Sequence, residues 1–272
     1  MTALVLTLRE APARRIDVSP LAPDRLQRMS RREIAGIPLH YGNRRCPLGD
    51  LFEIDGTDPG TLVIRNATDR LDGIGARMRD GSIRVEGDAG NYLGHGMLGG
   101  SIRVEGRSGH WTASGMAAGC IGVDGDCGDF AGAAQPGDRK GMLGGSLLIR
   151  GRAGDRLGDH MRRGQILVGG GAGDYCGSRM LAGTIAVLGD VGAAAGYGMR
   201  RGTLLFTQRP AALPATFGDC GIHELAYLRL LFASWHALDN GFAGFADAGI
   251  RVRRFVGDLA TRGNGELLAP PD

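Results

Sequence analysis

Apolar and non-apolar residues alternate over short stretches that recur at a fixed interval along most of the chain. Residues 83–85 read I-R-V, and residues 102–104 repeat these letters nineteen positions later. Alternation with a period of two is typical of a strand with one buried face. Glycines flank each stretch and allow the backbone to turn with positive φ. The pattern therefore predicts many short strands joined by tight turns.

Methionines mark the same repeat. Five of the six intervals between seven of the methionines are 19 residues and one is 26; these residues are Met78, Met97, Met116, Met142, Met161, Met180 and Met199. The consensus is M-x-x-G-x-I-x-V-x-G-x-x-G-x-x-x-G. A strand this short cannot bury a face alone, so successive units must stack about 4.8 Å apart. We predict an all-β fold: a right-handed parallel β-helix with 19-residue coils and about seven to eight turns.

Two chemical interpretations of the repeat are less favoured than a purely structural role for its residues. The segment GHGMLG matches G-x-G-x-x-G, but Gly94 and Gly99 recur as corners of successive units and no long helix follows them. We therefore expect no dinucleotide site there. The methionine column could be a thioether metal site, but Met commonly fills irregular gaps in a core, and we interpret the column as core packing.

The repeat is interrupted once, by seven extra residues between Met116 and Met142. They produce the loop AGAAQPGDRKG. Loops that leave a rigid scaffold often carry recognition, so we predict a partner contact at Pro136, Asp138, Arg139 and Lys140. A passive surface loop is the alternative.

The outward positions of the strands change character along the chain. Early units place Arg84 and Arg103 there, whereas later units place leucines: Leu148, Leu167, Leu188 and Leu205. An exposed apolar stripe would be prone to association. Either the C-terminal helix or another protein of an assembly must cover it, and we include these four leucines among the candidate partner contacts.

The two ends differ from the repeat. The segment HELAYLRLLFASWHAL places Leu225, Leu228, Phe232 and Trp235 on one face of an amphipathic helix. Near the N-terminus, Ser30 and Glu33 have the spacing of a helix capping box. We predict a small α/β N-terminal cap at 1–57, a glycine-rich repeat domain at 58–207 and a helical C-terminal cap at 208–272.

Composition narrows the functional class. The chain has 49 glycines, but 43% of its residues are hydrophobic and its net charge is only +3, which argues against a disordered tract and a dedicated nucleic-acid binder. We expect no membrane-spanning helix and no secretory signal, and therefore a cytoplasmic protein. The cysteines are scattered without a C-x-x-C pair, so we interpret them as reduced, packed thiols.

The sequence contains few candidates for catalytic residues. The six histidines lack metal-binding spacings and no G-x-S-x-G occurs. Asp88, Asp129, Asp155 and Asp174 fall at the turns of the repeat, where aspartate serves turn geometry. We expect neither catalytic nor metal-binding residues on this chain.

Several segments resemble the C subunit of formylmethanofuran dehydrogenase over residues 46–262. They are the repeats GDAGNYLG, GDCGDFAG and GAGDYCG, the insertion GAAQPGDRKGMLGG, and the flanks PLGDLFEIDG and VRRFVGDL. Similar glycine-rich coils form the last domain of the glutamate synthase large subunit. The many arginines and few lysines favour the bacterial branch, the formyltransferase/hydrolase complex.

The resemblance implies a function through partners. In the bacterial branch a formyl group moves from formyl-tetrahydromethanopterin to a methanofuran-type carrier and is then hydrolysed to formate. The C subunit is then structural and non-catalytic, next to an amidohydrolase-like A subunit, the B subunit and a formyltransferase D subunit, with a metal on the hydrolase. The alternatives are the C subunit of an archaeal-type molybdenum or tungsten dehydrogenase, a stand-alone β-helix enzyme and a glutamate-synthase-like coupling domain.

Two arginine pairs recur at one position of the repeat: Arg162 with Arg163, and Arg200 with Arg201. The resemblance implies a carrier that bears glutamates, so these pairs are candidates for holding the carrier tail. Solvated corner residues are the alternative.

Overall fold

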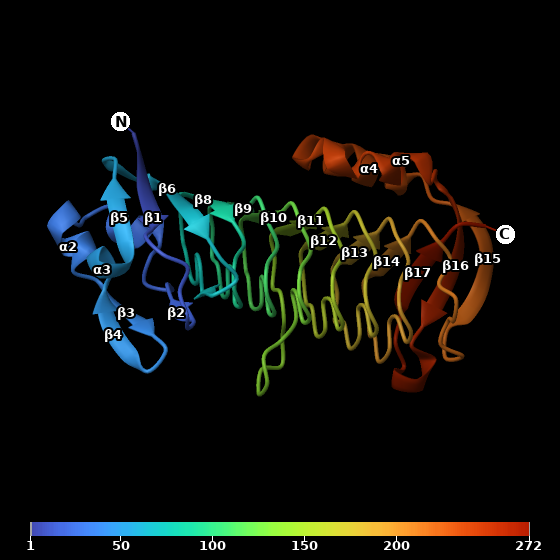
Figure 1. The fold of residues 1–272 in the computed structure, drawn as a ribbon. Coiled ribbons are helices and arrows are strands. Elements are labelled where there is room, and N and C mark those ends of the chain that lie inside the picture. The colour runs from blue at the N-terminus through green and yellow to red at the C-terminus, as the bar shows by residue number, and fades with distance from the viewer. Residues whose placement is uncertain (1, 272) are drawn as a thin grey trace.

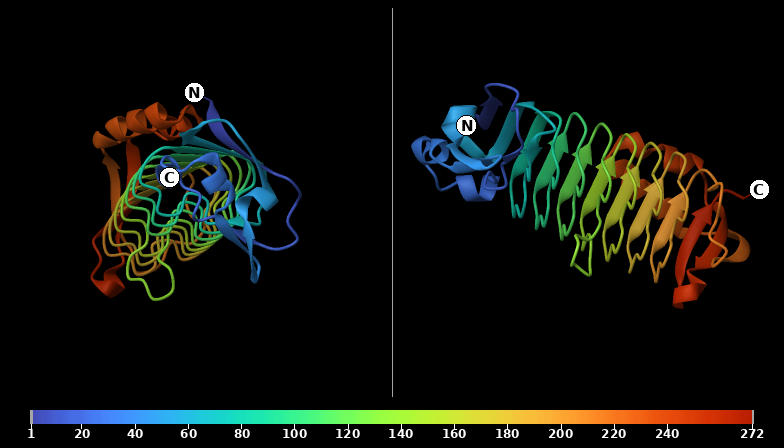
Figure 2. Two further views of the ribbon diagram at one scale, coloured as in Figure 1. Left: turned by 90° about the vertical axis from the view of Figure 1, so that its left-hand side faces the viewer. Right: turned by 60° about the horizontal axis from the view of Figure 1, so that its bottom comes forward.

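The computed structural model describes residues 2–271 and contains a 13-stranded sheet, a 4-stranded sheet and a few short helices (Figure 1). Seven successive strands form the middle of the large sheet, each parallel to the next: β8 (Ser82–Gly87), β9 (Ser101–Val104), β10 (Cys120–Val123), β11 (Ser146–Ile149), β12 (Gln165–Val168), β13 (Thr184–Val187) and β14 (Thr203–Phe206). Ile83 pairs with Ile102, and across the insertion Ile121 pairs with Leu147. Each sequence repeat therefore adds one strand to a rod of stacked units (Figure 2).

The two ends of the large sheet contain antiparallel pairs. At the N-terminal end, β1 (Ala3–Leu8) lies between β6 (Asp58–Ala67), to which it is parallel, and β5 (Phe52–Asp55), to which it is antiparallel. At the other end, β17 (Gly265–Ala269) follows β14, and two antiparallel strands complete the edge: β16 (Arg251–Gly257) and β15 (Gly218–Glu224).

The N-terminal region also holds the small sheet and three short helices. The sheet has the order β4 (Arg44–Pro47), β3 (Pro38–Tyr41), β2 (Ile16–Asp17) and β7 (Leu71–Asp72), and the helices are α1 (Pro23–Leu26), α2 (Arg31–Ala35) and α3 (Leu48–Leu51). Ser30 and Glu33 form the predicted capping box at α2. Along residues 2–271, no helix is both long enough and apolar enough to cross a membrane.

The prediction of a closed right-handed parallel β-helix with seven to eight turns is wrong. Regular strands line one side of the units, and elsewhere neighbouring units are joined by turns and by isolated bridges such as Ala89 to Ser108. The large sheet is also mixed, because its end strands run antiparallel. Each unit has only one I-x-V stretch; the glycine-rich remainder adopts turns such as Tyr92 and Gly94, with φ near 60°, which interrupt extended backbone.

The interior of the rod is a column of aliphatic side chains and methionines. All seven repeat methionines are fully buried in one hydrophobic cluster, which confirms their interpretation as core residues. The turns approach this core closely. A Cβ atom on Gly94 would lie 2.2 Å from Cδ1 of Ile121, so glycine is needed there for space as well as for its φ of 61°.

A C-terminal helix covers the leucine stripe on the outer face. Helix α4 (Tyr227–Leu238) lies across the strands together with α5 (Gly244–Asp247) (Figure 1). Its Leu228, Phe232 and Trp235 pack into a second cluster with the sheet leucines. Trp235 Nε1 donates a hydrogen bond to Gln165 Oε1 at 2.9 Å. The chain itself therefore provides the cover that the sequence requires.

Candidate functional site

A cavity of about 700 Å³ lies where the insertion loop, the turns of the later units and the C-terminal cap meet. Its walls come from Arg139, Lys140, His160, Arg179, Leu181, Tyr197, Gly198, Arg200, Asp258, Ala260 and Thr261. We call this cavity the basic groove, because four of these side chains are cationic. Ala260 and Thr261 belong to the short helix η2 (Leu259–Thr261).

Three of the four cations have no partner among residues 2–271. Arg139, Lys140 and Arg200 donate no side-chain hydrogen bond and form no ion pair within that range. All three are exposed. A site that carries several uncompensated cations attracts anions, so the basic groove is suited to an anionic ligand.

The fourth cation, Arg179, is held in place by a buried carboxylate. Asp159 is only 4% exposed. Its carboxylate accepts hydrogen bonds from Nε of Arg179 at 2.9 Å and from Nη2 at 2.5 Å. It also accepts the Ser178 hydroxyl at 2.9 Å. This ion pair fixes the Arg179 guanidinium at the wall of the groove and compensates its charge.

The acid of the groove, Asp258, is engaged by the main chain. It accepts hydrogen bonds from the N–H groups of Gly198 at 3.0 Å and Ala260 at 2.9 Å. Burial by itself raises the pKa of Asp258, but these bonds and one from Thr216 outweigh it, so the net pKa is below the ordinary value. Asp258 is therefore a charged, structural residue at neutral pH.

The structure brings only one of the four predicted arginines into the groove. Arg200 lines it, whereas Arg162, Arg163 and Arg201 are exposed outside it. Arg162 and Arg200 occupy equivalent positions, since their N–H groups bind the carbonyls of Met142 and Met180. Sequence reasoning missed Arg179. Its signal was a charged residue directly before a repeat methionine, a position that the turns bring to the surface.

The insertion loop projects from the side of the rod (Figure 1). Its base is fixed by two main-chain hydrogen bonds, Ala134 N to Asp159 O at 3.0 Å and Gly141 N to His160 O at 2.9 Å. Pro136, Asp138, Arg139 and Lys140 are all exposed. A second cavity of about 320 Å³ separates the loop from Trp111 and Phe130, whose rings stack 4.9 Å apart.

The candidate leucines are placed differently. Leu148, Leu167 and Leu205 are 5%, 0% and 2% exposed beneath the C-terminal helices, and Leu188 is partly buried at the border of the same cluster. In this structure the first three are not accessible to a partner.

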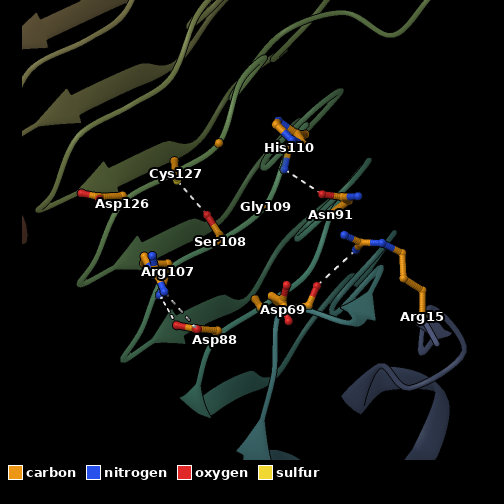
Figure 3. A pocket seen from close by; sticks show the side chains of 12 residues that line it. Arg15, Asp69, Asp88, Asn91, Arg107, Ser108, Gly109, His110, Asp126 and Cys127 are labelled. Carbon is orange, nitrogen blue, oxygen red and sulfur yellow. Dashed lines mark hydrogen bonds and ion pairs between the residues drawn. The ribbon is translucent and has the colours of Figure 1, made fainter. Parts of the chain in front are cut away.

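A polar trough of about 580 Å³ lies on another side of the early units (Figure 3). Arg15 reaches into it from the N-terminal cap and binds Asp72 at 2.6 Å. Arg107 lies 3.9 Å from Asp88, and His110 borders Asn91. Charges of both signs alternate here, so the trough has no preference for one sign.

Metal and thiol chemistry have little support in the geometry. No three His, Cys, Asp or Glu side chains between residues 2 and 271 are grouped as a metal site. The cysteines are all free, and burial raises the pKa of the Cys127 and Cys176 thiols to about 12. Those two thiols are therefore protonated and unreactive at neutral pH.

This chain is similar to known proteins in sequence and in structure. The model of the GXGXG motif family matches residues 52–219, more than half of the chain. The chain belongs to the GXGXG motif family. Its relatives include the C subunit of the formyltransferase/hydrolase complex Fhc of Methylorubrum extorquens, 44% identical over 90 residues, or 32% of this chain and 33% of the relative. Another is the C subunit of tungsten-containing formylmethanofuran dehydrogenase 2 of Methanococcus maripaludis, 32% identical over 95 residues, or 34% of this chain and 35% of the relative.

These alignments span about a third of the length of the curated relatives. A solved structure extends the likeness to the whole chain. In the crystal structure of the formyltransferase/hydrolase complex (FhcABCD) from Methylorubrum extorquens in complex with methylofuran, one chain is 43% identical with a TM-score of 0.91. The match covers 98% of this GXGXG chain and 100% of that chain. The resemblance to the C subunit of the bacterial branch is confirmed.

Proposed function

We propose that this chain is a structural, non-catalytic subunit of a formyltransferase/hydrolase complex. That complex transfers a formyl group from formyl-tetrahydromethanopterin to a methanofuran-type carrier and releases formate. The likeness over nearly all of the chain to one subunit of such a complex carries the proposal. The structure supports a scaffold, because its turn aspartates are engaged by main-chain N–H groups rather than grouped around a reaction centre.

The partners under this proposal are the amidohydrolase-like A subunit, the B subunit and the formyltransferase D subunit. The metal required for hydrolysis belongs to the hydrolase. A cytoplasmic location agrees with the five free cysteines, since reducing compartments keep thiols unpaired.

Reconstitution tests the scaffold role. Partner subunits prepared without this chain should keep the separate formyl-transfer and hydrolysis half-reactions but lose most of the coupled rate from formyl-tetrahydromethanopterin to formate. Adding the chain back should restore the coupled rate. Catalysis of either half-reaction by the chain alone would contradict a non-catalytic role.

We assign partner docking to the insertion loop. Its exposed tip and fixed base present Arg139 and Lys140, which form no ion pair within residues 2–271. Reversing both charges, Arg139→Glu with Lys140→Glu, should weaken association with the other subunits at least about tenfold and increasingly so at low salt. Reversal of Arg107, which is 71% exposed on the trough side, is the matched control. Equal binding by the loop variant and wild type would remove the loop from the interface.

We assign the carrier tail to the basic groove and the arginines beside it. The tail carries carboxylates. Arg200 lines the groove and Arg201 follows it in the sequence, while Arg162, next to Arg163, occupies the position equivalent to Arg200 in an earlier unit. Changing Arg162 and Arg163 together to Ser, or Arg200 and Arg201 together to Ser, should reduce the carrier retained by the purified complex. Unchanged carrier content in both variants, with the subunits still associated, would exclude these arginines.

A further inference from the structure

A ladder of side chains links the units along one edge of the rod. Six residues at equivalent positions each accept a hydrogen bond from the main-chain N–H of the next unit, at 2.7–3.0 Å; the acceptors are Asp72, Asn91, His110, Asp129, Asp155 and Asp174. This shared role explains why these positions are mostly Asp or Asn, because the side-chain oxygens of both residues accept such bonds. One position, His110, differs from the others.

His110 is the only acceptor of this ladder whose role reverses when it binds a proton. Its Nδ1 accepts the N–H of Asp129 at 3.0 Å. The neutral ring must therefore carry its proton on Nε2. A proton on Nδ1 converts that atom to a donor that faces another donor, and the hydrogen bond cannot persist. Carboxylates and amides at the other positions remain acceptors at neutral and mildly acidic pH.

The surroundings offer the protonated ring a second partner. The Asp129 carboxylate lies 3.6 Å from the same Nδ1, and the ring is 49% exposed, so solvent protons reach it. The ring also packs against the Trp111 ring in a T-shaped arrangement, with the two ring centroids 6.2 Å apart. Asn91 is the neutral neighbour, and the other charged groups lining this trough are Arg15, Asp69, Asp88, Arg107 and Asp126. A ring protonated on Nδ1 therefore has the Asp129 carboxylate as its nearest acceptor, in place of the Asp129 main-chain N–H.

We propose that His110 is a pH-sensitive joint between two units of the rod. In its neutral form it ties the main chain at Asp129 to the preceding unit, and in its charged form it releases that N–H. Asp129 lies directly before the insertion loop in the sequence. The next residue, Phe130, stacks on Trp111, and its carbonyl accepts a hydrogen bond from the N–H of Ala133. Acidification therefore loosens the segment that leads into the loop.

Amide hydrogen exchange of the full chain tests the joint, because the Asp129 N–H has the His110 ring as its hydrogen-bond acceptor. Protection factors, corrected for intrinsic exchange, are compared at about pH 8 and about pH 5.5. These values lie on either side of the ordinary pKa of a histidine side chain. We expect protection of the Asp129 N–H to fall at least about tenfold in wild type, while the N–H of Asp155 and Asn91 stay protected.

Two variants separate the joint from a general effect of acid. His110→Asn restores an amide oxygen, as at Asn91, and His110→Asp a carboxylate, as at Asp155. Both should keep the Asp129 N–H protected at either pH. Constant protection in wild type, or an equal loss in the His110→Asn variant, would overturn the proposal.

Discussion

At the scale of single residues, glycine and aspartate serve different purposes in each unit. Glycine permits the turns to approach the core, as at Gly94. Aspartate binds the main chain of the next unit, as Asp155 does with Asp174 N. The sequence predicted the buried methionines because their spacing reports directly on stacking. It assigned the aspartates to turns but did not predict that they bridge units, since a single repeat does not show which neighbour its side chain meets.

The space around glycine predicts the outcome of two matched substitutions. Gly94→Ala puts a Cβ 2.2 Å from Ile121 at a φ of 61°, so we expect a loss of at least about 2 kcal/mol in the free energy of unfolding. Gly122→Ala lies in β10, where the nearest atom to its Cβ is 3.9 Å away, and should change stability by less than about 0.5 kcal/mol. Chemical denaturation of both variants measures this. Equal effects would mean that the turn is not tightly packed.

Asp258 predicts a pH-dependent contribution to stability. Its pKa in the folded chain lies below the ordinary value, so the stabilisation is present above the ordinary carboxyl pKa of about 4 and is lost as pH falls through the lower folded value. Asp258→Ala should reduce the free energy of unfolding by about 1–3 kcal/mol at pH 7, and the difference should shrink below about pH 4. The exposed Asp138→Ala is the control. A deficit that does not depend on pH would contradict the assignment.

At the scale of elements, the parallel strands and the C-terminal helix were predictable, but the antiparallel pairing at the two ends of the large sheet was not. The alternation I-x-V predicted the parallel strands, and the apolar face of Leu228, Phe232 and Trp235 predicted α4. The antiparallel strands β5, β15 and β16 lie outside the repeat, and the β1–β5 and β15–β16 pairings join residues that are far apart in the sequence. Pairing of that kind depends on tertiary contacts that local patterns do not contain.

Helix α4 predicts a contrast between its two faces. Trp235 is fully buried on the leucine stripe, so Trp235→Ala should destabilise the chain by about 3–5 kcal/mol. It should also increase binding of a dye that detects exposed apolar surface. Leu230 is 78% exposed on the opposite face, and Leu230→Ala should stay within about 0.5 kcal/mol of wild type. If the tryptophan variant matched wild type, the helix would not be the cover of the stripe.

At the scale of the whole molecule, the rod separates its charged surfaces. The basic groove and the insertion loop lie together at the later units, whereas the polar trough lies at the early ones. The sequence indicated the loop and the arginine pairs as binding surfaces. It did not show that Arg139, Lys140, Arg179 and Arg200 line one cavity, because the first two come from the insertion and the others from two later units, and they converge only when the units stack.

As proposed above, this chain is the scaffold of a formyltransferase/hydrolase complex. The most direct test is native mass spectrometry of the assembly isolated through a tag on this chain, with every subunit identified. We expect a stable assembly that contains the formyltransferase and the amidohydrolase-like subunits. A chain that is isolated only as a monomer or as copies of itself would contradict it.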